Sequence, residues 1–193
     1  MFHYPHAISS KLPKVGTTIF SVMSKLAQEH NAFNLSQGFP DFAVDPRLIE
    51  LVTFHMKSGN NQYPPMPGII SLRERISLKT KASYGTEYDP DTEITITAGA
   101  TQALFTAITA FISEGDEVII FTPAYDCYAP AVELAGGKPV YIQLLPKDFS
   151  IDWNQVKKVV SRKTKMIIIN SPHNPSGSII DANDLDELAN ITR

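Results

Sequence analysis

Apolar and polar positions alternate along the second half of the chain in a way that predicts strands separated by helices. Four short runs rich in β-branched residues predict strands, at 94–97, 118–121, 139–142 and 166–169. Apolar-periodic segments at 101–113, 129–135, 152–161 and 181–191 predict the helices between and after them. Strands that alternate with helices and are apolar throughout predict a parallel sheet covered on both faces.

The first half of the chain has a different pattern, with helices joined by long loops. Ile19, Val22, Met23 and Leu26 share one face of a helix predicted to run from Thr17 to about His30. Two more helices are predicted, one from Asp45-Pro46 to the stop at Gly59 and one over 69–84. Residues 1–16, with two prolines, predict an irregular arm, and 34–45 and 60–68 predict loops.

Composition narrows the classes of function. The chain has 193 residues, is 43% hydrophobic and carries 17 basic against 20 acidic residues, for a net charge of −3. This balance argues against a nucleic-acid surface or a polybasic membrane anchor. A single cysteine, Cys127, excludes an internal disulfide and a multi-cysteine metal site. No apolar run approaches the ~20 residues that span a bilayer, and no signal peptide is recognisable, so we expect a cytoplasmic α/β protein.

Ligands of parallel α/β sheets lie beyond the carboxyl ends of the strands, so the loops there carry the candidate chemistry. In the loop 97–102, the small residues Gly99 and Ala100 precede a predicted helix, where backbone N–H groups and the helix dipole favour a phosphate. Thr101 could add a hydroxyl donor. The alternative is a tight turn with a threonine cap and no ligand, because small residues are common there.

The next two loops carry an aromatic residue and a proline-rich segment. Tyr125 could stack on a planar ligand, or it could simply cover the sheet edge with Tyr128. Cys127 beside them is expected to be a small packed residue. Residues 170–177 read Asn-Ser-Pro-His-Asn-Pro-Ser-Gly, and two prolines in four residues fit neither a strand nor a helix start. An asparagine amide held there suits a phenolate-like oxygen; the alternative is a stiff connection, with His173 facing solvent.

Taken together, six motifs resemble those of the fold-type-I pyridoxal-phosphate (PLP) aminotransferases, closest to the methionine and kynurenine (glutamine-type) branch. They lie in the family's order and cover most of the chain: 16–20 (GTTIF), 34–42 (NLSQGFPDF), 61–63 (NQY), 97–104 (TAGATQAL), 123–128 (PAYDCY) and 170–177 (NSPHNPSG). The resemblance implies a mainly parallel three-layer αβα large domain, incomplete here. It implies a division into an arm, helix and substrate loop at 1–45 and a partial cofactor-binding domain at 46–193, without the small C-terminal domain.

The resemblance also implies a role for particular residues. Gly99, Ala100 and Thr101 match the turn that holds the cofactor phosphate, Tyr125 the aromatic that stacks on the pyridine ring, and Asn174 the asparagine at the ring's 3-hydroxyl oxygen, near the substrate. Further matches place Tyr63 at the cofactor phosphate of the other subunit of a homodimer, Gly38 at the substrate carboxylate and Ile19 near the substrate side chain. Thr122-Pro123 and Asn174-Pro175 are candidates for cis peptides.

The implied activity is transfer of an amino group between an amino acid (methionine, aromatic or glutamine-like) and a 2-oxo acid, with PLP as electron sink and no metal. The family's Schiff-base lysine lies in a Ser-x-x-Lys segment, and none of the twelve lysines here has a serine three positions before it. The family's Asp-x-x-Tyr pair and its carboxylate-binding arginine are also not found. We therefore expect an N-terminal fragment that is inactive alone.

Three explanations of this fragment stay open: a truncated form of a normal enzyme, which we favour because no motif looks eroded, one piece that pairs with a second chain, and a degenerate protein. A rival from another class is a non-catalytic module that binds a phosphate ligand without the lysine. A nucleotide-dependent methyltransferase is a weaker rival, since the chain has no glycine-rich first loop and its Pro172-His173 differs from that group's Asn-Pro-Pro-aromatic loop.

Overall fold

The computed structural model describes residues 9–38 and 40–193, which form two compact units. One unit contains residues 17–98, and the other contains the arm up to residue 16 together with residues 99–193. The first eight residues of the expected arm, and Phe39 of the Gln-Gly-Phe-Pro-Asp loop, lie outside the described residues. The functional division that the resemblance implies at residue 45 stays a prediction.

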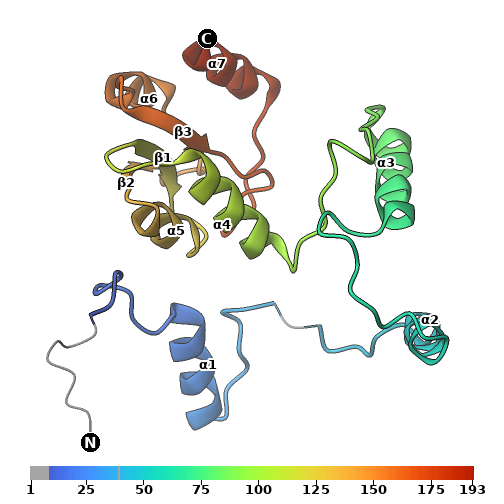
Figure 1. Ribbon diagram of the computed structural model, residues 1–193. Helices are drawn as coiled ribbons and strands as arrows, with labels where there is room; N and C mark the ends of the chain where they lie inside the picture. The colour runs from blue at the N-terminus through green and yellow to red at the C-terminus, as the bar shows by residue number, and fades with distance from the viewer. Residues whose placement is uncertain (1–8, 39) are drawn as a thin grey trace, which may run out of the picture. The chain divides into compact units, whose positions relative to one another are not determined.

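A three-stranded parallel sheet lies at the centre of the second unit (Figure 1). Its strands are β1 (Glu117–Thr122), β2 (Lys138–Gln143) and β3 (Thr164–Ile168), in the spatial order β2-β1-β3. In register, Ile119 lies between Val140 of β2 and Ile167 of β3. The central position of β1 explains its continuous apolar sequence, because a strand paired on both edges and covered on both faces meets no water.

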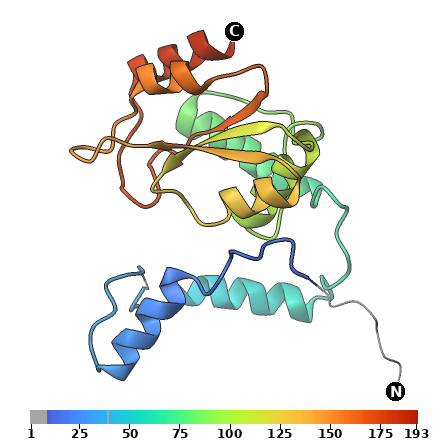
Figure 2. The same cartoon turned by 90° about the vertical axis from the view of Figure 1, so that its left-hand side faces the viewer.

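Helices cover both faces of this sheet, as the alternation of elements predicted (Figure 2). Val118 and Ile120 of β1 pack against α4 (Ala100–Phe111) and α5 (Tyr128–Leu134). The alternate residues Ile119 and Phe121 pack against α6 (Trp153–Val159), with Ile191 of α7 (Ala182–Thr192) at the edge of that cluster. Successive side chains of a strand point to opposite faces, so one short strand supplies both cores.

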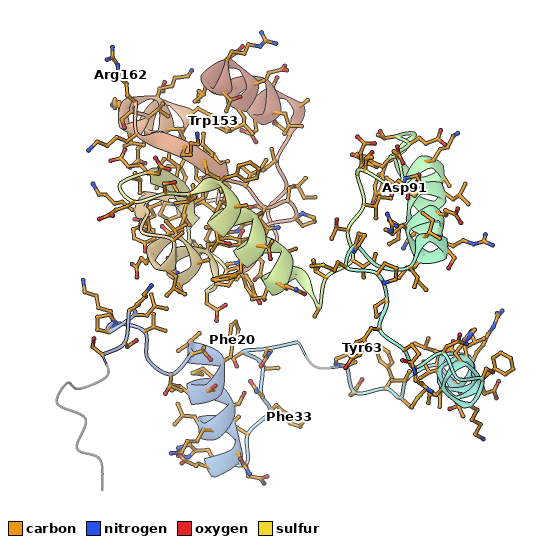
Figure 3. All side chains as sticks on the ribbon, viewed as in Figure 1. Phe20, Phe33, Tyr63, Asp91, Trp153 and Arg162 are labelled. Carbon is orange, nitrogen blue, oxygen red and sulfur yellow. The ribbon has the colours of Figure 1, made fainter. Side chains whose placement is uncertain are left out.

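The predicted start signals of α6 and α7 act as caps. The Asp152 carboxylate accepts hydrogen bonds from the backbone N–H groups of Asn154 and Gln155, at 3.0 and 3.2 Å. Asp181 and Asp184 form a reciprocal capping box at the start of α7. Asp184 also accepts a bond of 2.7 Å from the Trp153 indole N–H, which joins α6 to α7 (Trp153 is labelled in Figure 3).

The other unit contains α1 (Ile19–Glu29), α2 (Pro46–Lys57) and α3 (Ile70–Tyr84). Thr18 and Asp45 cap α1 and α2 through their side-chain oxygens, and α3 ends at Gly85 in the left-handed conformation. All three helices confirm the sequence-based expectation to within one or two residues at either end.

Arg73 of α3 is a buried cation that the sequence pattern does not reveal. Its guanidinium donates to the carbonyl oxygen of Gly68 at 3.1 Å, and to those of Pro90 and Asp91. The Asp91 carboxylate, beside α3 in Figure 3, lies 3.7 Å from the guanidinium. Arg73 thereby holds the turns before and after α3 against the helix, and its own charge is satisfied by oxygen atoms.

The prediction of a strand at 94–97 is wrong. The sheet contains three strands rather than the four expected, and residues 94–97 are not among them. The Ile96 backbone N–H instead donates to the Pro67 carbonyl oxygen at 2.9 Å. A β-branched run becomes a strand only where a neighbouring strand offers a ladder, and here its partner is a turn.

No helix among residues 9–38 and 40–193 is long and apolar enough to cross a membrane.

Candidate functional site

The carboxyl ends of the three parallel strands bring several predicted site residues to one edge of the sheet. The loop after β1 carries Tyr125, and the loop after β3 carries Asn174. The start of α4 lies beside Tyr125, as the hydrogen bond described below requires. Parallel strands end at a common edge, so Tyr125 and Asn174, which are about fifty positions apart in sequence, can line one site.

The start of α4 has the geometry of an anion site. Gly99 is the N-cap residue, with φ 86° and ψ 168°, a conformation that is essentially restricted to glycine. A Cβ built on Gly99 would have no atom within 4 Å, so a ligand could approach the backbone there. Ala100 and Thr101 form the first turn of this 12-residue helix and are exposed. The helix dipole and first-turn N–H groups favour a negative charge at this place.

Tyr125 connects this helix start to the loop after β1. Its phenolic oxygen lies 3.3 Å from the Thr101 hydroxyl oxygen. Its ring is half-buried and meets the Tyr128 ring edge-on, with centroids 5.8 Å apart and planes at 71°. Tyr128 is buried in the core, so its contact orients Tyr125. An aromatic face is thus held next to the start of α4.

The loop after β3 is held by side-chain and backbone bonds. The Asn174 backbone N–H donates to the Asn170 side-chain oxygen at 2.7 Å, and the Gly177 N–H donates to the His173 carbonyl oxygen at 2.7 Å. Asn174 is exposed, and its carboxamide has no hydrogen-bond partner within the part of the chain that the structure describes. The peptides before Pro123 and Pro175 are cis, as expected, and so is the one before Pro172.

His173 does not face solvent, which corrects the expectation from sequence. It is half-buried, and its Nδ1 lies 2.7 Å from the Ser176 hydroxyl oxygen. Burial lowers the pKa of His173 below its ordinary value of 6.5, and a hydrogen bond to the Pro123 backbone opposes that shift in pKa. The sequence gives no signal of this contact, since Pro123 is fifty residues away.

A cavity of about 210 Å³ lies at the same edge of the sheet. Its wall includes apolar side chains from β1, α5 and β3, namely Phe121, Tyr128 and Ile168, and the polar side chains of Asn170 and His173. The loop after β3 therefore has two polar side chains, Asn170 and His173, at the cavity, and another, Asn174, that is exposed.

Three predicted site residues belong to the other unit. Tyr63 is 97% exposed (Figure 3), Ile19 is 64% exposed, and Gly38 has no neighbour within 4 Å of a hypothetical Cβ. The structure therefore brings Thr101 and Tyr125 together, with the Asn174 loop at the same edge of the sheet. Ile19, Gly38 and Tyr63 are exposed positions of their own unit.

Other reactive groups are few. Within residues 9–38 and 40–193, no group of three His, Cys, Asp or Glu residues could hold a metal ion. Cys127 is half-buried beside Tyr128, as expected for a packed residue, and burial, with the Asp126 charge, raises the pKa of its thiol. A thiol with a raised pKa is a poor nucleophile at neutral pH.

Comparison with known proteins links this geometry to one family. The family model for aminotransferase class I and II matches residues 30–193. The methionine aminotransferase of Escherichia coli is 49% identical over 97% of this chain, and an N-succinyldiaminopimelate aminotransferase of Mycobacterium tuberculosis is 39% identical over 94%. The crystal structure of YbdL from E. coli, described as having a methionine aminotransferase function, superposes with a TM-score of 0.92 at 49% identity and 97% coverage. An aspartate aminotransferase from Thermus thermophilus gives 0.84 at 29% identity.

The matches cover only part of each relative. The chain spans about half the length of the curated relatives it matches, 49% of the E. coli protein and 46% of the M. tuberculosis protein. It likewise covers 49% of the YbdL structure and 50% of the T. thermophilus structure.

Proposed function

Because this chain belongs to the class I and II aminotransferases, we propose that it forms the cofactor-cradling half of a PLP-dependent enzyme. That enzyme moves an amino group between an amino acid and a 2-oxo acid. The observation that carries the proposal is the 3.3 Å contact between Thr101 and Tyr125 at the start of α4. It joins an anion site to an aromatic face, and PLP is a phosphate joined to an aromatic ring.

The residues present fit this cofactor. The glycine-only backbone of Gly99 leaves room for the phosphate, which the N–H groups of Ala100 and Thr101 and the Thr101 hydroxyl would hold. Tyr125 would stack on the pyridine ring. The exposed carboxamide of Asn174 would donate to the oxygen on the ring. When bound, PLP supplies an electron sink for the pair left on the amino acid Cα after proton loss.

The remaining assignments rest on the family alone. Gly38 is proposed to meet the substrate carboxylate through its backbone, Ile19 to lie near the substrate side chain, and Tyr63 to reach the cofactor phosphate of a second subunit. The high exposure of Ile19 and Tyr63 is compatible with contacts to groups outside their own unit. A homodimer and a cytoplasmic location are part of the same proposal.

The amino donor is proposed to be methionine or an aromatic or glutamine-like amino acid. The 49% identity to the E. coli methionine aminotransferase favours methionine among these.

We further propose that these 193 residues do not transaminate by themselves. Proton transfer at Cα needs a lysine, which also binds the cofactor covalently, and no lysine of this chain lies in a Ser-x-x-Lys segment. The second candidate function, a non-catalytic module for a phosphate ligand, follows from the same observation. A Ser-x-x-Lys segment in the reading frame after Arg193 would favour the enzyme, and its absence there would favour the module.

Equilibrium dialysis of the purified chain against PLP tests the cofactor role, followed by an assay for 2-oxo acid formation from methionine. We expect saturable binding, weakened by Thr101→Ala and unaffected by Thr109→Ala, since Thr109 lies on the same helix and its hydroxyl bonds the Phe105 carbonyl. Binding that is equal in both variants would contradict the phosphate site. Turnover by the chain alone would contradict the proposed inactivity.

A further inference from the structure

Asn170 lies at the start of the loop after β3, and its side chain bonds to a residue four positions further along the chain. The last strand residue, Ile168, pairs in register with Ile120 of the central strand β1, so the sheet fixes the backbone up to this point. Asn170 Oδ1 accepts a hydrogen bond of 2.7 Å from the Asn174 backbone N–H. A backbone N–H only donates, so the carboxamide oxygen must face it. The bond therefore joins the Asn174 backbone to the end of β3.

Other hydrogen bonds shape the loop without tying its middle to the strand. The His173 N–H donates to the Ser178 carbonyl oxygen at 2.8 Å, and the Gly177 N–H donates to the His173 carbonyl oxygen at 2.7 Å. These two bonds close the turn on itself. The Ser171 hydroxyl oxygen accepts a bond of 3.1 Å from the Ile180 N–H, which joins the two ends of the loop. The turn thus has a defined shape, and its place relative to β3 depends on the 2.7 Å bond described above.

The two asparagines differ in how their side chains are held. The Asn170 side chain is half-buried and lines the cavity together with Phe121 and Ile168. The Asn174 side chain is exposed, so its direction depends on where its backbone is placed. A packed residue that bonds an exposed binding residue pre-organises it. Asn170 has both the burial and the bond that such a support requires.

We propose that Asn170 is a positioning residue, whose Oδ1 holds the Asn174 backbone at the end of β3 and so directs the Asn174 carboxamide to the oxygen on the PLP ring. This inference rests on the proposed function, because Asn174 has a ring to meet only if the site holds PLP. Without the bond from Asn170, the cost of ordering the Asn174 side chain would be subtracted from the binding free energy.

Two substitutions of Asn170 separate its acceptor from its size. Asn170→Leu removes the oxygen at a similar volume, whereas Asn170→Asp keeps an acceptor oxygen. We expect Asn170→Leu to weaken PLP binding about threefold to tenfold, the range of one lost hydrogen bond, and Asn170→Asp to restore most of that affinity. Binding of inorganic phosphate should not change, because the proposed phosphate site is the start of α4.

A double-mutant cycle with Asn174→Ala gives a result that a purely structural role would not produce. If Asn170 acts through the Asn174 carboxamide, Asn170→Leu should cost nothing further in PLP affinity once that carboxamide is gone. The loss in Asn170→Leu alone should also not exceed the loss in Asn174→Ala. Asn154→Leu, at an exposed asparagine of α6, is the matched control and should leave PLP affinity unchanged.

Hydrogen exchange of the full chain, followed by NMR, tests the bond without PLP. The Asn174 amide should exchange slowly in wild type and in Asn170→Asp, and faster in Asn170→Leu, because a hydrogen-bonded N–H is protected until the bond opens. An Asn174 amide that exchanges equally fast in wild type and Asn170→Leu would overturn the proposal.

Calorimetric titrations with PLP and with inorganic phosphate complete the test. A loss of PLP affinity in Asn170→Leu that disappears in the Asn174→Ala background, with phosphate affinity retained, supports the positioning role. Equal losses for PLP and phosphate, strictly additive losses in the cycle, or an Asn170→Asp variant as weak as Asn170→Leu would overturn it. If the wild type binds no PLP, the proposed function fails and the positioning role with it, whereas unchanged PLP affinity in Asn170→Leu overturns the positioning role alone.

Discussion

The phenolic oxygen of Tyr125 lies 3.3 Å from the hydroxyl oxygen of Thr101, across 24 positions of sequence. This contact ties the first turn of α4 to the loop after β1. It is the point at which a helix end suited to an anion meets an aromatic ring suited to stacking.

The pair should act together in binding PLP. Tyr125→Phe removes the hydroxyl and keeps the ring, so we expect a weakening of about threefold to tenfold, typical of a lost hydrogen bond. Thr101→Ala should cost more, because it also removes a donor to the phosphate. Isothermal titration calorimetry of both single variants and the double variant measures their coupling. Strictly additive losses would show that the Thr101–Tyr125 contact is not used, and Tyr141→Phe on β2 serves as the control.

Gly99→Ala should destabilise the protein. A residue with a side chain at φ 86° and ψ 168° is strained by about 1–3 kcal/mol, although the space around Gly99 is open. The free energy of unfolding in urea should therefore fall by that amount. Gly16→Ala, which also meets open space and needs no positive φ, should change it by less than about 0.5 kcal/mol. Equal effects of both changes would contradict the backbone conformation of Gly99.

Arg73 and Arg75 provide a second matched pair. Both lie on α3, but Arg73 is 6% exposed and bonded to three carbonyl oxygens, whereas Arg75 is exposed. Arg73→Met leaves these oxygens without a donor, and we expect a loss of about 2–4 kcal/mol in the free energy of unfolding. Arg75→Met should be nearly neutral. Urea denaturation measures both, and similar small losses would show that the guanidinium bonds do not form.

Stability should depend on pH through His173. The pKa of His173 in the folded protein is lower than its ordinary value of 6.5. At a pH between the folded-state pKa and 6.5, the unfolded chain therefore binds a proton that the folded chain does not. The free energy of unfolding should therefore fall as the pH drops below about 6.5, and this loss should level off below the folded-state pKa. The fall between pH 7.5 and pH 5.5 should be smaller in His173→Asn than in wild type. An identical fall in both proteins would contradict a half-buried His173 whose pKa is lowered on folding.

Much of the fold could be predicted from local patterns. The helices starting at Thr18, Asp45, Asp152 and Asp181 form as expected, because a capping side chain and the following apolar period act within one turn. The three sheet strands were predicted from their apolar runs, which are most continuous in β1, where four successive residues are buried. The prediction of a strand at 94–97 was wrong, because a strand also needs a neighbouring strand to pair with. Sequence alone does not show which segment lies beside Ile96.

Individual residues of the candidate site could be predicted from sequence, but the contacts between its loops could not. Gly99, Ala100 and Thr101 could be proposed from sequence because a turn of small residues before a helix favours an anion by itself. His173 was misjudged because its burial depends on Pro123 and Ser176, and the Pro123 contact crosses from one loop to another. Arg73 was missed because its acceptors are backbone carbonyls, which leave no trace in residue type.

A crystal structure of the chain with PLP tests the central claim most directly, namely that these residues form a cofactor cradle. We predict electron density for the phosphate at the N–H groups of Ala100 and Thr101, with the ring on Tyr125 and its oxygen near Asn174. Density for PLP elsewhere on the chain, or none at these residues at a saturating concentration, would contradict the account.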